Sequence, residues 1–483
     1  MKKKEAIFIT EWKDEMKRRI KLRFKGRPLS DKKIEKYLDR MVEEHMSNPK
    51  VSVVNNYRNQ VVHTDLLSLI DTIRENNLII GGGGVLFVQH NTPGKPNVLF
   101  KYILMLQETR AKYKNKRKDY DKGTIFWVMY NNYQQNTKTN LNSLYGVHGY
   151  AMFVLYNRYI AECITNQGRQ IITTAVMTFE TFLSNGIRFN TEEEVYKFIT
   201  NVIDDYTDAF SEHPLDASYF PIDNIDHKVV KRILDICVFE CSDEFVLNIE
   251  NIIRNLSYEE KVMFYYKNNL YEFSKLPFIK DKLKFVIDSL DEFNAPERKL
   301  IKNDELLSIV NELDKFYETF VLYDHPMYDR VRKAMYTDRD SVLYVDTDSN
   351  FLGLNKWVEF VKSDILEYQY NKPETNIEFI TVNLMALFLE NVIDHGLQTL
   401  CKHMNVKPEY AKRLYMKNEF YLSRIIFTDA KKRYISNSIL QEGQLLNNGL
   451  GLPDIKGFDK LNVECCEFLR IIETLRLCIN TLY

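Results

Sequence analysis

The sequence predicts an α+β protein. Three observations support this fold class: long stretches with apolar residues at helical spacing, short β-branched runs paired around turn residues, and an apolar content of 45% that can fill buried cores. A chain of 483 residues is also long enough for more than one subdomain.

The bulk composition excludes several classes of protein. The net charge is −1, so a nucleic acid would have to be bound by local clusters of Lys and Arg. None of the seven cysteines forms a C-x-x-C pair, which argues against a structural zinc site and is typical of a reducing, cytoplasmic compartment. No apolar run reaches the roughly 18 residues of a membrane helix, and the basic N-terminus lacks a signal-peptide pattern.

The residue pattern in the first part of the chain predicts one helix, two hairpins and a second helix. Residues 1–46 form an amphipathic pattern with Ser30 as a helix N-cap. Residues 50–63 predict two short strands around an Asn-rich turn, and residues 64–78 are helix-like. The run "IIGGGGVLF" could be a phosphate loop or a hairpin turn. It lacks the Lys-Ser/Thr and the G-x-G-x-x-G spacing of phosphate loops, so we favour the turn.

The remainder predicts mainly helices, with two further strand pairs. Helical patterns run from Val98 to Asp119 and from Thr124 to Gly146, and the "DYDKG" between them predicts an antiparallel helical hairpin. Residues 170–340 are helix-rich and carry no readable motif. A long apolar helix is expected near 377–404, followed by two strands joined through residues 428–430.

The stretch "YVDTDSNF" places Asp346 and Asp348 two residues apart between apolar strands. Residues i and i+2 of a strand point to the same side, so both carboxylates could face one site. Carboxylate oxygens are the ligands that Mg²⁺ prefers. The alternative is an ordinary acidic turn, because Asp is favoured in turns.

The second helix of the predicted hairpin contains "NTKTNLNSLYGVHGY". Lys138, Asn142 and Tyr145 fall at i, i+4 and i+7, which is one helical face. A cation, an amide and an aromatic ring on one face make a poor core. Gly146, directly after Tyr145, would let a backbone or a ligand approach closely.

The first helix of the hairpin carries Arg110 and Lys114 at i, i+4, followed by residues 116–118, which are all basic. Two antiparallel helices with these faces would make a basic wall suited to a triphosphate. The alternative interpretation of this charge run is a solvated helix face.

Together these residues resemble the family B DNA polymerases. The fingers motif K-x-x-x-N-S-x-Y-G is matched by residues 138–146, the palm motif Y-x-D-T-D-S by residues 344–349, and K-K-R-Y by residues 431–434. The likeness covers about residues 50–165 and 335–460, and it is greatest to polymerases of large double-stranded DNA phages.

The resemblance implies a fragment of the right-hand polymerase fold, with an antiparallel-sheet palm, helical-hairpin fingers and a helix-rich insertion. The expected domains are an N-terminal helix and palm-associated region (1–95), the fingers hairpin (96–165), the helix-rich palm insertion (166–335), the palm with its DTDS and KKRY motifs (336–440) and the start of the thumb (441–483).

The resemblance implies template-directed DNA synthesis from dNTPs with two Mg²⁺ ions. Asp348 would be the direct ligand of both ions, with Asp346 close to the primer end. The metals would lower the pKa of the primer 3′-hydroxyl and neutralise charge on the phosphates, while the protein mainly supplies positioning. This requires the acidic hairpin and the face of Lys138 to converge on one cavity.

The resemblance also implies which residues bind nucleotide and DNA. Tyr145 would test the shape of the nascent base pair, and Lys432 would follow the primer through the minor groove. Glu419 matches an acidic position beside the metal site, and Gly457 belongs to the junction of palm and thumb. The implied nucleotide-binding residues are Arg110, Lys114, Lys138, Asn142 and Tyr145, and the implied DNA-binding residues are Gly146, Lys431, Lys432, Arg433, Tyr434 and Lys456.

The chain departs from the family at the strand that carries the second carboxylate, D-x-x-S-L-Y-P-S. In "HTDLLSLIDTI", Asp65, Ser68 and Leu69 fit this pattern, but Ile70 and Asp71 stand where Tyr and Pro belong. Residues 65–72 also have a helical apolar pattern. Two alternatives follow: Asp65 completes the metal site, or the strand lies on another polypeptide, which we favour.

We expect a split replicative polymerase of a phage, in the cytoplasm of the infected host cell or a phage replication compartment. No exonuclease signature is found, and the expected thumb extends past Tyr483. The expected partners are primer–template DNA, dNTPs, and polypeptides that carry the exonuclease, the first metal-binding strand and the rest of the thumb. A sliding clamp is a further candidate. The rival from another class is a non-catalytic DNA-binding or scaffold subunit of a replication complex.

Overall fold

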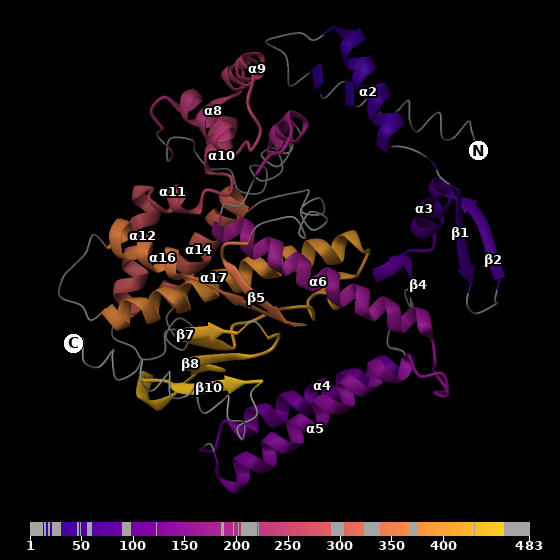
Figure 1. Ribbon diagram of the computed structural model, residues 1–483, viewed down its shortest axis with the longest axis vertical. Coiled ribbons are helices and arrows are strands. Elements are labelled where there is room, and N and C mark those ends of the chain that lie inside the picture. Colours follow the sequence, from indigo (N-terminus) through magenta and orange to yellow (C-terminus); the bar gives the residue numbers. More distant parts are fainter. Residues whose placement is uncertain are drawn as a thin grey trace. The chain divides into compact units, whose positions relative to one another are not determined.

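The structure of the chain is a computed structural model (Figure 1). It describes residues 13, 16, 17, 20, 21, 30–45, 48, 50–55, 60–88, 98–121, 123–184, 188–196, 198–200, 202, 203, 220, 222–290, 304–322, 339–346, 348–366, 374–428 and 430–457. Thr347, Asp429 and residues 458–483, the end of the expected thumb start, lie outside these ranges, as does most of the expected helix before Ser30.

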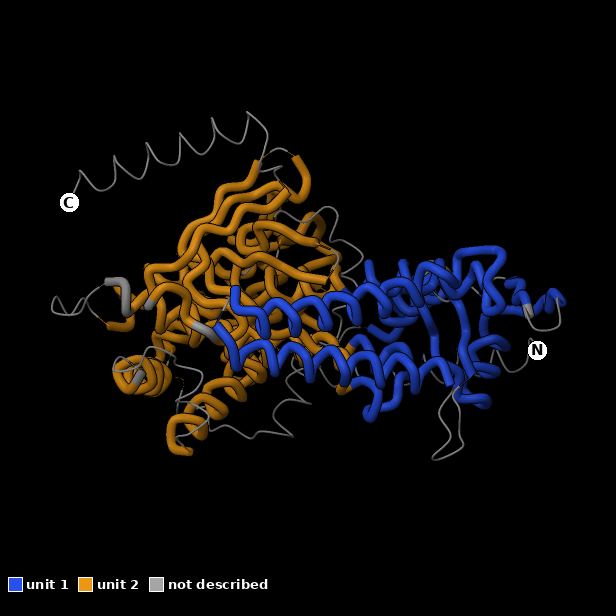
Figure 2. Tube along the Cα trace, turned by 90° about the horizontal axis from the view of Figure 1, so that it is seen from below, with its two compact units in different colours: residues 1–171, 400–411 blue, residues 172–399, 412–483 orange. Residues whose placement is uncertain are grey.

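The chain divides into two compact units (Figure 2). Unit 1 contains residues 1–171 and 400–411, and unit 2 contains residues 172–399 and 412–483. Two of the three boundaries fall inside long helices, α6 (Arg158–Ser184) and α17 (Glu374–His403), and the third follows α18 (Pro408–Ala411). Helices make up most of the described structure and the sheets are small and antiparallel, so the α+β class is confirmed. The expected domain boundaries remain predictions.

Unit 1 begins with the helix and hairpins that the sequence predicts. Its first elements are α2 (Asp31–His45), β1 (Lys50–Asn55), β2 (Gln60–Asp65), α3 (Leu66–Glu75), β3 (Leu78–Ile80) and β4 (Leu86–Val88). β1 pairs with β2 and β3 with β4, both antiparallel. The Gly run is a hairpin turn: Gly83 and Gly84 have φ of 75° and 80°, in the left-handed region that glycine tolerates.

The predicted helical hairpin is confirmed. It consists of α4 (Val98–Arg117) and α5 (Ile125–His148), which run side by side (Figure 1). Thr124 is the N-cap of α5, because its side chain accepts a hydrogen bond from the backbone N–H of Trp127. Arg117 donates to Asn131 at 3.0 Å, and the rings of Tyr113 and Tyr133 lie 5.2 Å apart. These contacts pair the end of α4 with the start of α5, as an antiparallel hairpin requires.

Unit 2 contains a helical core, as predicted for residues 170–340. Its helices include α8 (Ile225–Asp235), α9 (Asp243–Arg254), α10 (Tyr258–Tyr266), α11 (Leu270–Ser274), α12 (Pro277–Leu290), α14 (Asp304–Phe316), α16 (Asn355–Phe360) and most of α17. Buried aromatic rings fill the core. Phe220 lies 4.8 Å from Phe320, and Tyr317 lies 5.4 Å from Phe388. Edge-to-face and tilted contacts of this kind stabilise a core beyond simple burial.

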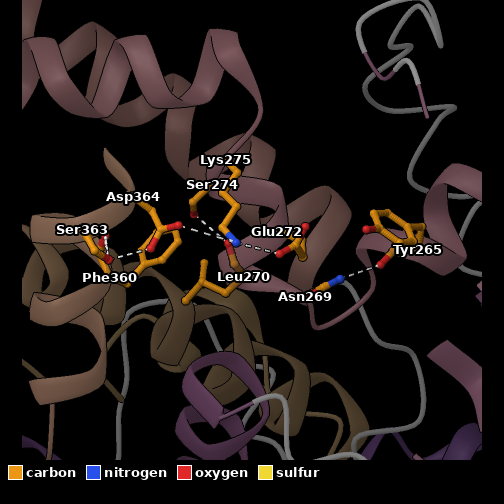
Figure 3. Close-up of polar contacts among 9 residues, drawn as sticks. All are labelled: Tyr265, Asn269, Leu270, Glu272, Ser274, Lys275, Phe360, Ser363 and Asp364. Atoms are coloured by element: carbon orange, nitrogen blue, oxygen red, sulfur yellow. Dashed lines mark hydrogen bonds and ion pairs between the residues drawn. The ribbon is translucent and has the colours of Figure 1, made fainter. Parts of the chain in front are cut away.

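At the surface of this core, Lys275 links α11 to the π-helical turn η5 (Val361–Ile365). Its ammonium lies 2.9 Å from Glu272 and 3.7 Å from Asp364 (Figure 3). The hydrogen bond to Glu272 is the main cause that raises the pKa of Lys275. All three side chains are partly exposed to solvent, so these pairs contribute about 0–1 kcal/mol each, and the core is held mainly by apolar burial.

Two small sheets complete unit 2. The hairpin of β5 (Val342–Asp346) and β6 (Ser349–Leu352) forms one sheet. The other contains β7 (Phe420–Phe427), β8 (Tyr434–Gln441), β9 (Gln444–Leu445) and β10 (Leu452–Lys456). β8 lies between β7 and β10 (Figure 1), and all pairings are antiparallel. The predicted strand pairs at 341–354 and 418–439 are therefore present.

A buried carboxylate fixes the start of β5. Glu180, on the part of α6 that belongs to unit 2, is 2% exposed and accepts hydrogen bonds from the backbone N–H groups of Asp340 (3.1 Å), Ser341 (2.9 Å) and Val342 (2.5 Å). Ser184, one turn later, also donates to Glu180. The N–H groups of Ser341 and Val342 are buried and need an acceptor. Glu180 thus ties a helix to a strand that is remote in sequence.

We predict that Glu180→Ala lowers the free energy of unfolding by about 2–4 kcal/mol, because buried N–H groups lose their acceptor. Glu180→Gln is the matched control: it keeps an acceptor oxygen and should cost about half as much or less. Denaturant titration followed by circular dichroism measures both. Equal losses for the two variants would show that packing, not hydrogen bonding, holds β5.

Candidate active site

The acidic hairpin is the β5–β6 turn. Asp346 is the last residue of β5 and pairs with Ser349, while Asp348 lies in the turn and is exposed. The expectation that both carboxylates project from one strand is therefore wrong for Asp348, because the strand ends before it. Both residues still lie at the tip of one hairpin, so a turn, not strand alternation, presents them together.

Four aromatic rings hold this hairpin against the β7–β8 hairpin. Tyr344 and Phe351 are cross-strand partners, and so are Phe427 and Tyr434. The rings of Tyr344 and Phe427 stack at 5.3 Å with an interplanar angle of 18°, and those of Phe351 and Tyr434 meet at 5.4 Å. Each such contact adds about 0.5–1.5 kcal/mol beyond area burial. The acidic tip is thus attached to the strands that carry K-K-R-Y.

Lys432 brings the K-K-R-Y turn to the acidic tip. Its ammonium lies 3.3 Å from Oδ1 of Asp346, and its backbone has φ of 64°. Both side chains are substantially exposed, so the pair itself contributes about 0–1 kcal/mol. Its significance is geometric: two motifs that are far apart in the sequence lie next to each other.

The Lys456-Gly457 segment packs against the same turn. Lys456 pairs with Tyr434 across β10 and β8. Gly457 has φ of 75°, and a Cβ built on it would lie far inside the contact distance of the Lys432 carbonyl oxygen. Only glycine lets the two backbones come this close. Three of the motifs selected from the sequence therefore meet at one edge of the sheet.

The environment of Tyr434 reveals a carboxylate that the sequence reasoning missed. Burial raises the pKa of Tyr434, and the charges of Asp454 and Asp346 raise it further. Asp454 on β10 also pairs with Lys456 at 3.3 Å. The sequence did contain a signal for this carboxylate, because Asp454 and Lys456 are two residues apart on a strand and therefore point to the same face. The described residues contain no group of three or more His, Cys, Asp or Glu side chains arranged to hold a metal.

The predicted face of α5 is exposed in unit 1. Lys138, Asn142 and Tyr145 all face solvent, and the hydroxyl of Tyr145 lies 2.8 Å from Oγ1 of Thr165 on α6. This contact fixes the direction of the ring. A Cβ on Gly146 would meet no described atom within 4 Å, so no described backbone uses the space that this glycine leaves.

Arg110 and Lys114 lie on α4, one turn apart and both partly buried. Nε of Arg110 is buried and has no hydrogen-bond partner among the described residues. The pairing of Tyr113 with Tyr133 predicts that Arg110, one turn earlier on α4, lies level with the turn of α5 that ends at Lys138. The helical hairpin belongs to unit 1 and the acidic hairpin to unit 2, so their convergence stays a prediction.

Comparisons with known proteins identify the family. The family described as "DNA polymerase family B" matches residues 52–211, and "Divergent Family B DNA polymerase" matches residues 280–459, which contain the acidic hairpin and the K-K-R-Y turn. Over these two stretches the chain is similar to the family B DNA polymerases. The resemblance found in the motifs is thereby confirmed.

Two curated proteins that are similar to this chain are viral. The DNA polymerases of Autographa californica nuclear polyhedrosis virus and Bombyx mori nuclear polyhedrosis virus are 27% and 26% identical to it over 105 residues. The matched stretch is 22% of this chain and 10% of each relative, so the chain spans about a tenth of their length. No solved structure matches the chain. A phage origin remains a prediction.

Asp65, the candidate for the missing family B carboxylate, is the N-cap of α3. It is 8% exposed, and it accepts hydrogen bonds from the backbone N–H and Oγ of Ser68 and from Nδ2 of Asn48, all at 3.0 Å. The backbone bond from Ser68, followed by that from Asn48, lowers the pKa of Asp65. The helical pattern predicted for 65–72 is confirmed by α3, and Asp65 has a clear capping role.

Glu419 does not lie beside the acidic tip, as the family B resemblance implied. It precedes β7, whereas the tip docks on Phe427 at the other end of that strand. Eight residues of strand separate the two ends by about 26 Å. The residue type at position 419 matches the family pattern. The direction of β7, however, places Glu419 at the end of the strand that is far from the acidic tip.

We predict that Gly457→Ala destabilises the K-K-R-Y turn much more than Gly449→Ala does. Both glycines have positive φ (75° and 87°), so an alanine costs similar backbone strain at each, about 1–2 kcal/mol. Only at position 457 does the new Cβ also collide with a backbone oxygen. Thermal unfolding and limited proteolysis between Thr428 and Tyr434 measure the difference. Equal effects of the two alanines would contradict this close packing.

Proposed function

We propose that this chain carries out template-directed DNA synthesis, adding deoxynucleotides from dNTPs to a primer 3′-hydroxyl, with the acidic hairpin as the reaction centre. One observation carries the proposal. Stacked aromatic rings and an ion pair hold the acidic tip against the K-K-R-Y turn, and a glycine contact packs the Lys456-Gly457 segment against the same turn. An acidic turn that served only to connect strands would need none of these contacts. The family B relationship supports the same conclusion.

The acidic tip fits Mg²⁺. Asp346 already attracts a cation, the ammonium of Lys432, and the exposed Asp348 has room for ligands around it. Mg²⁺ is usually bound by one or two carboxylates, with water and substrate phosphates completing the shell. Magnesium ions held by Asp348 and Asp346 would lower the pKa of the 3′-hydroxyl and neutralise phosphate charge.

The helical hairpin would bind the incoming nucleotide. Arg110, Lys114 and Lys138 would hold the triphosphate, with Asn142 in support. The buried Nε of Arg110, unpaired among the described residues, supports this role, because an unsatisfied donor costs about 1–3 kcal/mol that a phosphate oxygen would recover. Tyr145, held by Thr165, would present a fixed ring to the nascent base pair.

The K-K-R-Y turn would bind the primer–template duplex. Lys431, Lys432 and Arg433 are exposed on it, and Lys456 is exposed on the neighbouring strand. When DNA enters, Lys432 would exchange Asp346 for the minor groove. Binding through such cations should weaken steeply as the salt concentration rises.

Two forms of the proposal differ in the source of the second carboxylate. In the split form, partner polypeptides bring that strand, together with the exonuclease, the rest of the thumb and, as a further partner, a sliding clamp. In the single-chain form Asp65 supplies it. The family match from residue 52 includes Asp65 and favours the single chain, whereas its three hydrogen bonds favour a purely capping role.

We predict that Asp348→Asn reduces primer extension by about 10³-fold or more, equal to about 4 kcal/mol of transition-state stabilisation, because a neutral amide is a poor magnesium ligand. Affinity for primer–template should change less than twofold. Asp364→Asn, on η5, is the control. Extension is assayed for the chain alone and mixed with candidate partner polypeptides. Full extension by Asp348→Asn would remove this residue from the site, and no extension in any mixture would favour a non-catalytic DNA-binding subunit.

We predict that Asp65→Asn separates the two forms. Asn is as good an N-cap as Asp, so α3 keeps its start and the unfolding free energy falls by less than about 1 kcal/mol. In the split form, extension in the active mixture is unchanged. In the single-chain form it falls about 10³-fold with the fold intact. Circular dichroism and extension by the same preparation measure both quantities.

A further inference from the structure

The tip of the α4–α5 hairpin carries a cluster of aromatic rings, which we call the aromatic tip: Tyr113, Tyr120, Phe126, Tyr130 and Tyr133. Tyr120 stacks between two others, 5.2 Å from Phe126 and 5.7 Å from Tyr130, at interplanar angles of 30° and 21°. Tyr113 lies 5.2 Å from Tyr133. The rings therefore support one another in fixed orientations.

These rings are not a closed core. Phe126 is 54% exposed, Tyr133 45% and Tyr120 37%. By contrast, Phe220 and Phe320 in unit 2 are completely buried. Rings that are ordered by stacking and are still partly exposed offer an apolar surface to a ligand.

The hairpin is strongly basic although the chain as a whole is not. Residues 98–148 contain nine Lys and Arg and three Asp and Glu, a balance of +6, against −1 for the whole chain. α5 contains no acidic residue. At the tip itself, the ammonium of Lys116 lies 5.5 Å above the ring of Tyr130, and the guanidinium of Arg117 lies 5.5 Å above Trp127. Cations therefore lie next to aromatic rings at the tip.

The outer rings of the aromatic tip, Tyr120 and Phe126, are separate from Lys138, which is proposed to bind the triphosphate. Phe126 and Lys138 are twelve residues apart on one helix, which is about 18 Å along its axis. A ligand at these two outer rings would therefore occupy a different place from a triphosphate at Lys138.

We propose that the aromatic tip binds single-stranded DNA. Unpaired bases stack on aromatic faces, and the phosphates pair with neighbouring Lys and Arg, which is the chemistry that a basic surface with open rings provides. A duplex hides its base faces and would gain only from the charges. An acidic protein would likewise use the charges and leave the rings without a partner. That this strand is the unpaired template rests on the proposed function, whereas the binding itself does not.

The test is the fluorescence anisotropy of a labelled dT15 oligonucleotide with the full chain, without divalent metal or dNTP. A labelled blunt duplex of 15 base pairs is the comparison. We expect the double variant Tyr120→Ala/Phe126→Ala to weaken dT15 binding at least tenfold and duplex binding less than twofold. Ile125→Ala is the matched control: it is 84% exposed at the same tip, apolar but unable to stack, and should change binding less than twofold.

Two single substitutions at Phe126 and a measurement of helix content distinguish the loss of stacking from unfolding. Phe126→Trp should retain dT15 binding and Phe126→Leu should lose it, and circular dichroism should show the same helix content for all variants. The proposal is overturned if the double variant binds dT15 normally, if it loses duplex binding equally, or if polyglutamate displaces dT15 as well as unlabelled dT15 does. Asp348→Asn should bind dT15 normally, so a failure of the catalytic proposal and a failure of this one are distinguishable.

Discussion

The carboxylate of Glu180 accepts hydrogen bonds from the backbone N–H groups at the start of β5, and the geometry of the acidic hairpin depends on this contact. A short hairpin has little core of its own and is marginal in isolation. Here one end of β5 is held by Glu180 from α6, and the ring of Tyr344, near the other end, stacks on Phe427. Between these supports the direction of β5 is determined. The tip with Asp346 and Asp348 is placed by residues that have no part in the proposed chemistry.

The charged residues around the K-K-R-Y turn contribute little to the stability of the fold. Asp346, Lys432, Asp454 and Lys456 form two pairs of opposite charge around the Tyr434 ring. None of these pairs contributes much stability, because all are open to solvent. Their charges are therefore available to exchange partners when an ion or a phosphate arrives. The aromatic rings beneath them supply the rigidity, so binding and stability rest on different residues.

The two family matches leave out residues 212–279, in which α8, α9 and α10 lie. These helices are not a separate appendage, because Phe220 and Tyr266 pack with Phe273 and Phe320 in the core of unit 2. That residues 166–335 form an insertion in a palm stays a prediction. Removal of these helices would expose the aromatic core of unit 2.

The sequence by itself determined the local structure and the family. Helical periodicity located α4, α5 and α17, turn residues located the hairpins, and the spacing in K-x-x-x-N-S-x-Y-G and Y-x-D-T-D-S indicated the resemblance to family B polymerases. These signals depend on neighbours within a few residues, which is the range over which periodicity and turn chemistry act. Only the tertiary structure decided which distant groups meet. Three contacts cannot be found from sequence periodicity: Glu180 with β5, Lys432 with Asp346, and Gly457 with the Lys432 carbonyl. Each of them joins segments whose separation is set by packing. For the same reason the sequence misplaced Glu419, since the direction in which β7 runs from the acidic tip is a property of the assembled sheet.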